Sequence, residues 1–298
     1  MAIVFSSLVA VGVGVMSGRV PGDLGLAILV AGSLAAGVGF WDDHRSLHPG
    51  LRFAGQMAVA GVLVWLIGTP RPRDLLLFEI NSTYLAFASV IALVWLINLT
   101  NFMDGIDGLV AAECVFVMGA RGVLLYPSGD RDLVYACFAV AAAAAGFLPL
   151  NWAPARIFMG DVGSGYIGVT FGALLLADIV REPTHLWVWL ILLGTFLADS
   201  TVTLLRRIAA GKRAWEAHRS HAYQRVSRGW GHGKTTKAYL IVNLLWLAPL
   251  ALCASRWPQA GPFWFLVATG PLVVSACYLG AGTEERNVEQ SRKSVALI

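Results

Sequence analysis

The most distinctive chemical feature of the sequence is a row of side-chain oxygens that follows the apolar stretch at residues 84–97. Asn98, Asn101 and Asp104 recur every three residues, so a helix continued through them places them roughly on one face, with Asp107 extending the row. Two interspersed glycines allow the backbone to turn or to approach a ligand closely. Helix capping would account for one or two of these polar residues, but it does not account for all four. Such oxygens suit Mg²⁺, which takes one or two protein ligands together with water and substrate phosphates.

Two further acidic motifs lie before and after this row. Asp42 and Asp43 are adjacent carboxylates, followed by Arg45 and Arg52. Adjacent carboxylates repel each other and need a cation, a proton or water. Asp161 lies in a glycine-rich Phe-Met-Gly-Asp-Val-Gly-Ser-Gly segment, where backbone N–H groups can converge on a phosphate while the carboxylate meets its metal. Taken alone, each motif also fits a structural turn.

A fourth polar motif lies in a basic segment at residues 206–237. Its side chains combine planar hydrogen-bond donors with a ring that can stack: His218, Arg219, His221, Tyr223 and Arg225. These groups are suited to holding a nucleotide diphosphate. The basic residues fit equally well as topology determinants at a membrane surface or as contacts with anionic lipid.

The elements that must position these motifs are membrane helices. The 298 residues are 57% hydrophobic and 13% charged, with a mean hydropathy of +0.68, which is too apolar for one soluble core. Lipid offers no partners to backbone polar groups, so each spanning segment is expected to be helical. We predict an all-α polytopic protein with about ten transmembrane helices, in a single integral-membrane domain over residues 1–298 with a tail at 279–298. The apolar stretches cover residues 2–16, 24–40, 53–67, 84–97, 109–125, 133–150, 166–180, 186–205, 238–253 and 263–278.

The basic residues are divided unequally between the two sides of the predicted membrane domain. Most of the 22 Lys and Arg residues lie in the loops at 41–52, 98–108, 151–165 and 206–237 and in the tail. This excess predicts that these loops, which carry all four motifs, are cytoplasmic. Because the positive charge lies in short loops, we predict no nucleic-acid partner. The four cysteines have neither paired spacing nor histidine partners, so neither a zinc site nor a disulfide framework is indicated.

In this order and spacing, the four motifs resemble those of the polyprenyl-phosphate N-acetylhexosamine-1-phosphate transferases, the glycosyltransferase 4 family. These enzymes begin peptidoglycan lipid, teichoic acid and O-antigen assembly. The resemblance covers about residues 1–240 and rests on the segments at 42–52, 98–109, 158–164 and 218–225. The fourth motif resembles the branch that uses UDP-N-acetylglucosamine or a related N-acetylated deoxyhexosamine for surface polysaccharide, and differs from the adjacent histidines of the muramoyl-pentapeptide branch.

The resemblance implies that a UDP-N-acetylhexosamine and undecaprenyl phosphate meet at the cytoplasmic face of the bacterial inner membrane. Sugar 1-phosphate is transferred and UMP is released. Mg²⁺, with Mn²⁺ as an alternative, is expected at Asn101 and Asp161. The implied catalytic acids are Asp42, which deprotonates or positions the acceptor, Asp43, Asp104 and Asp107. The implied substrate contacts are Arg45, Arg52, Asn98, His218, Arg219, His221, Tyr223 and Arg225.

Several points stay open at this level. Direct in-line displacement and a covalent aspartyl-phosphate route both fit the motifs, and the resemblance leaves room for a homodimer in the lipid bilayer. Family members usually begin with an additional membrane helix and a loop carrying a His and a Pro-x-Pro-Arg-Gly-Gly-like stretch. We expect this sequence to start just after that stretch, and a chain truncated there would be catalytically impaired. The main alternative is a transporter, which predicts acids near mid-span, whereas Glu113, Asp178 and Asp199 alone lie within apolar stretches.

Overall fold

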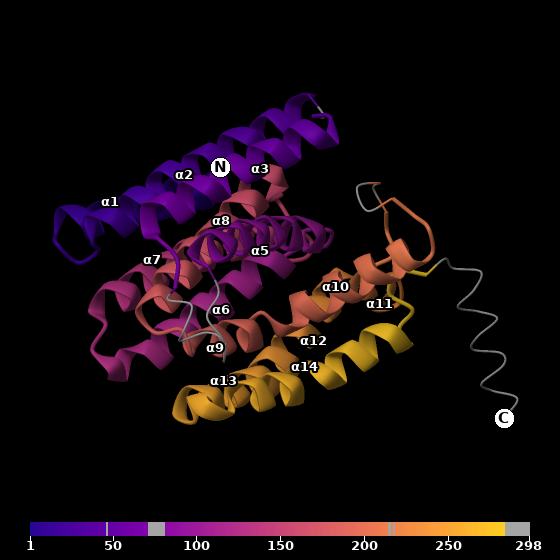
Figure 1. Cartoon of the computed structure of the whole chain (residues 1–298). Helices are drawn as coiled ribbons and strands as arrows, with labels where there is room; N and C mark the ends of the chain where they lie inside the picture. Colours follow the sequence, from indigo (N-terminus) through magenta and orange to yellow (C-terminus); the bar gives the residue numbers. More distant parts are fainter. Residues whose placement is uncertain (46, 71–80, 214–215, 217, 284–298) are drawn as a thin grey trace, which may run out of the picture.

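The fold is an all-helical bundle. The computed structural model describes residues 1–45, 47–70, 81–213, 216 and 218–283, which form helices and no strand (Figure 1). Eight segments of this part of the chain are long and apolar enough to cross a membrane. They contain α2 (Gly22–Arg45), α3 (Pro49–Ile67), α5 (Ser82–Met103), α6 (Leu109–Leu125), α7 (Arg131–Asn151), α8 (Gly160–Arg181), α12 (His232–Val242) with α13 (Ala248–Arg256), and α14 (Gly261–Tyr278).

Two further apolar elements complete the match with the predicted stretches. Helix α1 (Ala2–Met16) is apolar but shorter, and α9 (His185–Leu192) with α10 (Gly194–Ala209) forms a bent pair. Each of the ten predicted stretches therefore corresponds to a helix or a bent helix pair. The predicted all-α, multi-pass fold is confirmed.

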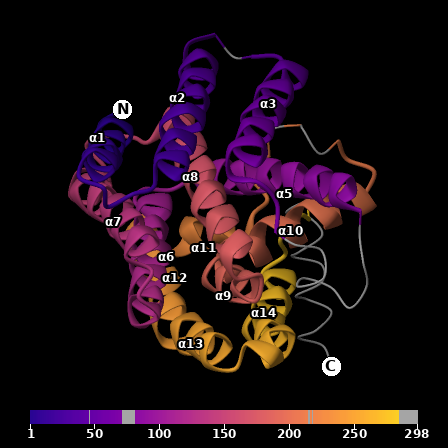
Figure 2. The same ribbon diagram turned by 60° about the vertical axis from the view of Figure 1, so that its left-hand side comes forward.

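Helix α8 lies at the centre of the bundle and is buried along almost its whole length (Figure 2). It packs against α2 and α5 through glycines that let the backbones approach closely. A Cβ at Gly39 of α2 would lie 2.4 Å from the carbonyl oxygen of Asp161, and one at Gly168 would lie 2.7 Å from the Cα of Ile97. The small residues thus bring the first three motifs together at one end of the bundle.

The outer surface of the bundle is apolar. Phe5, Trp65 and Leu245 are 73%, 80% and 74% exposed, and comparable side chains cover the outward face of α14. Such extensive exposure of large apolar side chains indicates a surface that faces lipid.

The predicted span at 186–205 is a bent pair of helices and not one continuous helix. The chain breaks at Leu193, and α9 and α10 meet at a bend of 73°. The apolar run contains no proline, and Gly194, directly after Leu193, is its local sign of the break. Its cause is tertiary, because polar side chains of α10 such as Thr195 and Asp199 are buried and find partners on α6, α11 and α12.

The predicted basic loop at 206–237 is partly helical. Helix α10 continues to Ala209, α11 (Ala222–Trp230) contains much of the fourth motif, and α12 begins at His232. Residues 214–215 and 217 of this segment, and 284–298 of the predicted tail, lie outside the described residues.

Candidate active site

Asp43 joins the end of α2 to the beginning of α8. Its carboxylate oxygens accept hydrogen bonds from the backbone N–H groups of Asp161 and Val162, at 3.0 and 3.3 Å. These N–H groups have no partner within the helix, and the positive end of the helix dipole favours an anion there. Gly160 has φ +67°, and a Cβ at this position would lie 2.8 Å from the carboxylate of Asp43. The glycine-rich motif therefore allows the carboxylate to seat against the helix end.

Asn101 and Asp161, the predicted metal ligands, are in direct contact. The amide of Asn101 donates to Oδ1 of Asp161 at 2.6 Å and to Oγ of Ser164 at 3.3 Å. A cavity of about 30 Å³ beside this pair is lined by Asp42 and Arg52 as well. Residues from the first three motifs, which are 49 or more positions apart, thus share one small space between α2, α3, α5 and α8.

Asp42 occupies the α3 side of this cavity. Its Oδ2 lies 3.4 Å from Nη1 of Arg52, and its Oδ1 accepts from the backbone N–H of Leu47 at 2.7 Å. The side chain of Asp42 is 8% exposed, so the ion pair is partly shielded from water. Arg45, predicted to bind substrate, is exposed at the end of α2.

Asn98 is engaged within the bundle. Its amide exchanges hydrogen bonds of 2.7 and 3.2 Å with Gln56 of α3. Gln56 lines the cavity, although it was given no predicted role. The signal that marks it in the sequence is a polar side chain inside the apolar stretch at 53–67, because such groups are costly in a membrane and are usually paired or functional.

Asp104 and Asp107 follow the end of α5 and have different surroundings. Burial, followed by the nearby negative charges of Asp161 and Asp43, raises the pKa of Asp104 well above its usual value. Asp107 instead accepts from the backbone N–H of Ala155 at 3.1 Å and lies 3.3 Å from Nδ1 of His232. Asp104 belongs to the acidic group, whereas Asp107 ties the segment before α8 and the start of α12 to this end of the bundle.

The two histidines of the fourth motif stack on each other. Their ring centroids are 4.9 Å apart with 25° between the planes, and both rings lie about 6 Å from that of Phe102, at 6.4 and 6.0 Å. His221 is buried, with Nδ1 3.2 Å from Oδ1 of Asp199. His218 is half-buried, and burial together with the positive charges of His221 and Arg207 lowers its pKa to about 4. His218 is therefore neutral near pH 7.

Of the remaining residues of the fourth motif, Tyr223 and Arg225 are held by contacts and Arg219 is exposed. Tyr223 is fully buried and its hydroxyl donates to the carbonyl oxygen of Phe102 at 2.9 Å. Burial raises the pKa of this hydroxyl, which keeps it a donor. Arg225 donates to the carbonyl oxygen of Thr283, and Arg219 is exposed. The motif is thus docked on the end of α5, next to Asn101.

The predicted site residues therefore form two adjoining groups and several outliers. The acidic group contains Asp42, Asp43, Asn101, Asp104 and Asp161, with Arg52. The histidine group contains His218, His221 and Tyr223 and adjoins the acidic group through Phe102. Asn98, Asp107 and Arg225 are occupied by other contacts. Asp199 and His232, which anchor the site, were missed because their partners are distant in sequence.

The acidic group fits Mg²⁺ by the chemistry of its donors. Among the described residues, no set of three or more His, Cys, Asp or Glu side chains forms a ready metal cage. Mg²⁺ does not require one, since it commonly keeps several waters and is bound by one or two protein oxygens plus substrate phosphates. Asn101 and Asp161 supply such oxygens, and the carboxylates around them supply negative charge.

One family model matches the part of the chain that forms the acidic group. The model of glycosyl transferase family 4 matches residues 25–178, just over half of the chain. The chain belongs to glycosyl transferase family 4. The matched range includes the first three motifs and ends before the fourth, so the acidic group lies within it and the histidine group does not.

Two kinds of relative are similar to the chain. One is a decaprenyl-phosphate N-acetylglucosaminephosphotransferase of Mycobacterium leprae, 29% identical over 263 residues, which include 77% of this chain and 63% of that protein. The same enzyme of Mycolicibacterium smegmatis is 30% identical over 263 residues, 77% of this chain and 62% of that protein. A phospho-N-acetylmuramoyl-pentapeptide-transferase of Lactiplantibacillus plantarum is 30% identical over 230 residues, 71% of this chain and 69% of that protein. The chain thus spans less than two thirds of the length of the mycobacterial relatives.

Proposed function

We propose that the protein transfers an N-acetylhexosamine 1-phosphate from a UDP-sugar to undecaprenyl phosphate and releases UMP. The observation that carries the proposal is the small cavity lined by Asp42, Arg52, Asn101 and Asp161. At this end of the membrane bundle, the oxygens of Asn101 and Asp161, which suit a metal ion, lie beside a further carboxylate and a guanidinium. The relatives named decaprenyl-phosphate N-acetylglucosaminephosphotransferase and phospho-N-acetylmuramoyl-pentapeptide-transferase support the same reaction class.

The chemistry brings two anions together. An oxygen of the lipid phosphate attacks the sugar-linked phosphorus, a new P–O bond forms, and the bond from that phosphorus to the UMP oxygen breaks. Asp42 positions or deprotonates the acceptor, and Arg52, 3.4 Å from its carboxylate, holds that carboxylate and offsets charge. Asn101 and Asp161 hold Mg²⁺, which supplies charge neutralisation at the diphosphate.

The other half of the site takes the nucleotide sugar. His218 of the histidine group and the neighbouring exposed Arg219 meet the donor, while His221 and Tyr223 fix their position. The neutral form of His218 provides a ring that stacks or hydrogen-bonds without adding charge. The basic segment favours a cytoplasmic site on the bacterial inner membrane, and the fourth motif favours the surface-polysaccharide branch.

A donor panel tests the proposal. Full-length protein in detergent is given undecaprenyl phosphate, Mg²⁺ and radiolabelled UDP-N-acetylglucosamine, UDP-N-acetylgalactosamine or other N-acetylated UDP-sugars, and both lipid-linked label and UMP are measured. One donor is expected to give equal amounts of both products, and EDTA is expected to stop the reaction. Absence of both products with every donor would reject the proposed function, whereas UMP without labelled lipid would indicate hydrolysis.

A further inference from the structure

Asp199 of α10 is a buried carboxylate that belongs to none of the four motifs. It is 2% exposed, yet it accepts hydrogen bonds from five donors on three helices and the segment before α11. The donors are Nδ1 of His221 (3.2 Å), the backbone N–H groups of Ala222 (2.9 Å) and Tyr223 (2.9 Å), the hydroxyl of Tyr239 (3.0 Å) and the hydroxyl of Thr203 (3.2 Å). Two oxygens thus organise a large part of the fourth motif.

The position of Asp199 relative to α11 explains why a carboxylate is suited to this role. Ala222 and Tyr223 begin α11, so their N–H groups lack partners within the helix. An anion there also faces the positive end of the helix dipole. An amide side chain has a single acceptor oxygen, and its NH₂ group would face donors. The site therefore favours Asp over its isosteric neighbour Asn.

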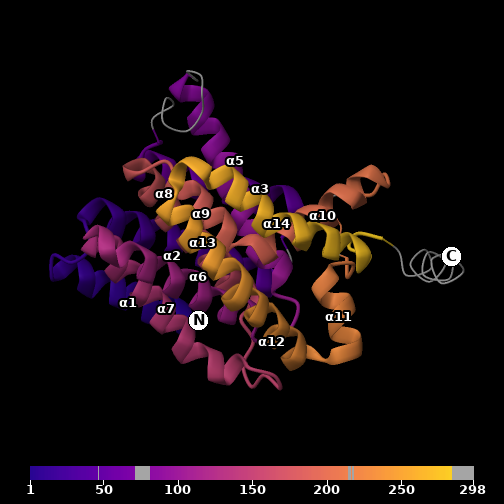
Figure 3. The same cartoon turned by 90° about the horizontal axis from the view of Figure 1, so that it is seen from below.

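The break between α9 and α10 places this carboxylate. Just after the bend, Thr195 donates to Oε1 of Glu113 at 3.3 Å and to Oδ1 of Asn243 at 3.1 Å, and the Asn243 amide donates to Oε2 of Glu113 at 2.5 Å. These contacts fasten the beginning of α10 to α6 and to the π-helical turn at Asn243–Leu247. From there α10 runs to the end of the molecule where α11 lies (Figure 3).

We infer that Asp199 is a positioning residue for the nucleotide-sugar half of the site, acting through His221 and the start of α11. It holds His221 under His218 and seats Tyr223 on the carbonyl of Phe102, one residue from Asn101. This inference rests on the proposed function for its kinetic consequence. Its structural consequence, an ordered start of α11, does not depend on any activity.

Hydrogen–deuterium exchange measures the structural consequence. In Asp199→Asn, the amides of Ala222 and Tyr223 lose a charged acceptor, and peptides covering residues 218–230 are expected to exchange about tenfold faster or more. Peptides from α7 serve as the folding control and are expected to be unchanged. Thr203→Val is the matched variant, because it removes one donor to the same carboxylate from within α10 and leaves α11 in place. Unchanged exchange at 218–230 in Asp199→Asn would overturn the inference.

Steady-state kinetics measure the functional consequence. Asp199→Asn is expected to raise the KM for the UDP-sugar about tenfold, with the KM for undecaprenyl phosphate within about twofold of wild type. A general loss of structure would instead lower the amount of active enzyme and leave both KM values unchanged, and that result would overturn the inference. Tyr239→Phe, which removes one of the five donors, gives a milder test if Asp199→Asn does not fold. Wild-type protein without transfer activity would reject the proposed function, while the exchange data would still decide the positioning role.

Discussion

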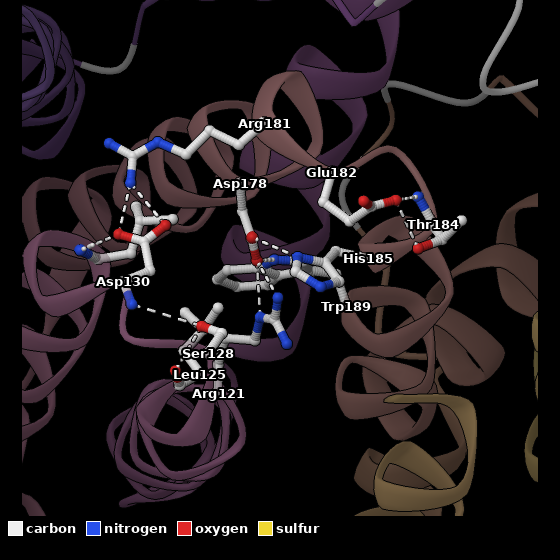
Figure 4. A network of polar contacts seen from close by, with 11 residues as sticks. Arg121, Leu125, Ser128, Asp130, Asp178, Arg181, Glu182, Thr184, His185 and Trp189 are labelled. Carbon is white, nitrogen blue, oxygen red and sulfur yellow. Dashed lines mark hydrogen bonds and ion pairs between the residues drawn. The ribbon is translucent and has the colours of Figure 1, made fainter. Parts of the chain in front are cut away.

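Asp178 and Asp161 occupy the two ends of the same central helix, and their surroundings differ. Asp178 is buried and accepts from Nε of Arg121 at 2.6 Å, from Nε1 of Trp189 at 2.7 Å and from Nδ1 of His185 at 2.7 Å (Figure 4). Nearby, Asp130 and Arg181 form an ion pair of 2.5 Å. Asp178 and Asp130 each have a cationic partner, and the nearby Glu182 accepts hydrogen bonds from Thr184.

At the other end, carboxylates gather around Asp161 with fewer cations. Asp42 pairs with Arg52, but Asp43 accepts from backbone N–H groups and Asp161 accepts from the Asn101 amide. Burial, followed by the negative charges of Asp161 and Asp43, raises the pKa of Asp104 at this end. Buried charge is tolerated where it is paired, as at Asp178, and is costly where it is not. The difference indicates that the end with Asp178 stabilises the fold, and it supports the proposal that the end with Asp161 receives a cation.

The largest expected effect is a loss of transfer activity on substitution at the Asp161 end of α8 but not at the Asp178 end. Asp161→Asn is expected to reduce transfer by about 10³-fold or more, since a metal contributes several kcal/mol to charge stabilisation. The protein should remain folded, because Asn is isosteric and keeps one acceptor for the Asn101 amide. Radiolabelled transfer and the Tm in detergent are measured together. Asp130→Asn is the matched control and should retain wild-type transfer. Near-normal rates in Asp161→Asn would show that the metal assignment is wrong.

The next largest effect is a loss of stability on substitution at the Asp178 end of α8. Arg121→Met leaves the Asp178 charge buried without its guanidinium and is expected to cost about 3–5 kcal/mol. Thermal unfolding in detergent measures the lowered Tm. Transfer per folded molecule should stay close to wild type, because the change is at the end away from the motifs. A specific loss of transfer with an unchanged Tm would contradict the structural role of this cluster.

The smallest effect concerns the pH dependence of the histidine group. The pKa of His218 is about 4 in the folded protein, against an ordinary value of 6.5. As the pH falls from 6.5 towards 4, the unfolded chain gains a proton here that the folded chain does not, so stability decreases. In His218→Gln this contribution is absent, and the Tm should fall less steeply over that range. An unchanged slope would mean that His218 titrates normally in the folded protein.

The sequence predicted those features that depend on residues close together in the chain, namely the membrane helices and the polar motifs. Apolar stretches predicted the helices, because in lipid the backbone N–H and C=O groups must hydrogen-bond to each other. The motif residues Asp42, Asn101 and Asp161 could be grouped in advance by their oxygen chemistry and by the resemblance. The bend at Leu193 could not, since its cause is the contact of Thr195 with residues 82 and 48 positions away.

The same limit applies to the anchoring residues. Asp107 looked like another site acid, but its carboxylate contacts Ala155 and lies beside His232, which is 125 positions away. In the sequence Asp199 is an acid within an apolar stretch, and in the structure it accepts hydrogen bonds from the start of α11. A carboxylate can bind a ligand or can hold two parts of the fold together. Which of these it does depends on contacts that form only in the folded chain. Spacing alone therefore does not show which of these acids gather around Asp161.

Mn²⁺ binding followed by electron paramagnetic resonance tests the central difference between the two ends most directly. Wild-type protein with a UDP-sugar donor should bind Mn²⁺ at a saturable site, and Mg²⁺ should displace it. Asp161→Asn should lose this site, and Asp130→Asn should keep it with unchanged affinity. Equal Mn²⁺ affinity in Asp161→Asn and wild type would contradict the account, because the acidic group around Asp161 would then not be the place where the cation binds.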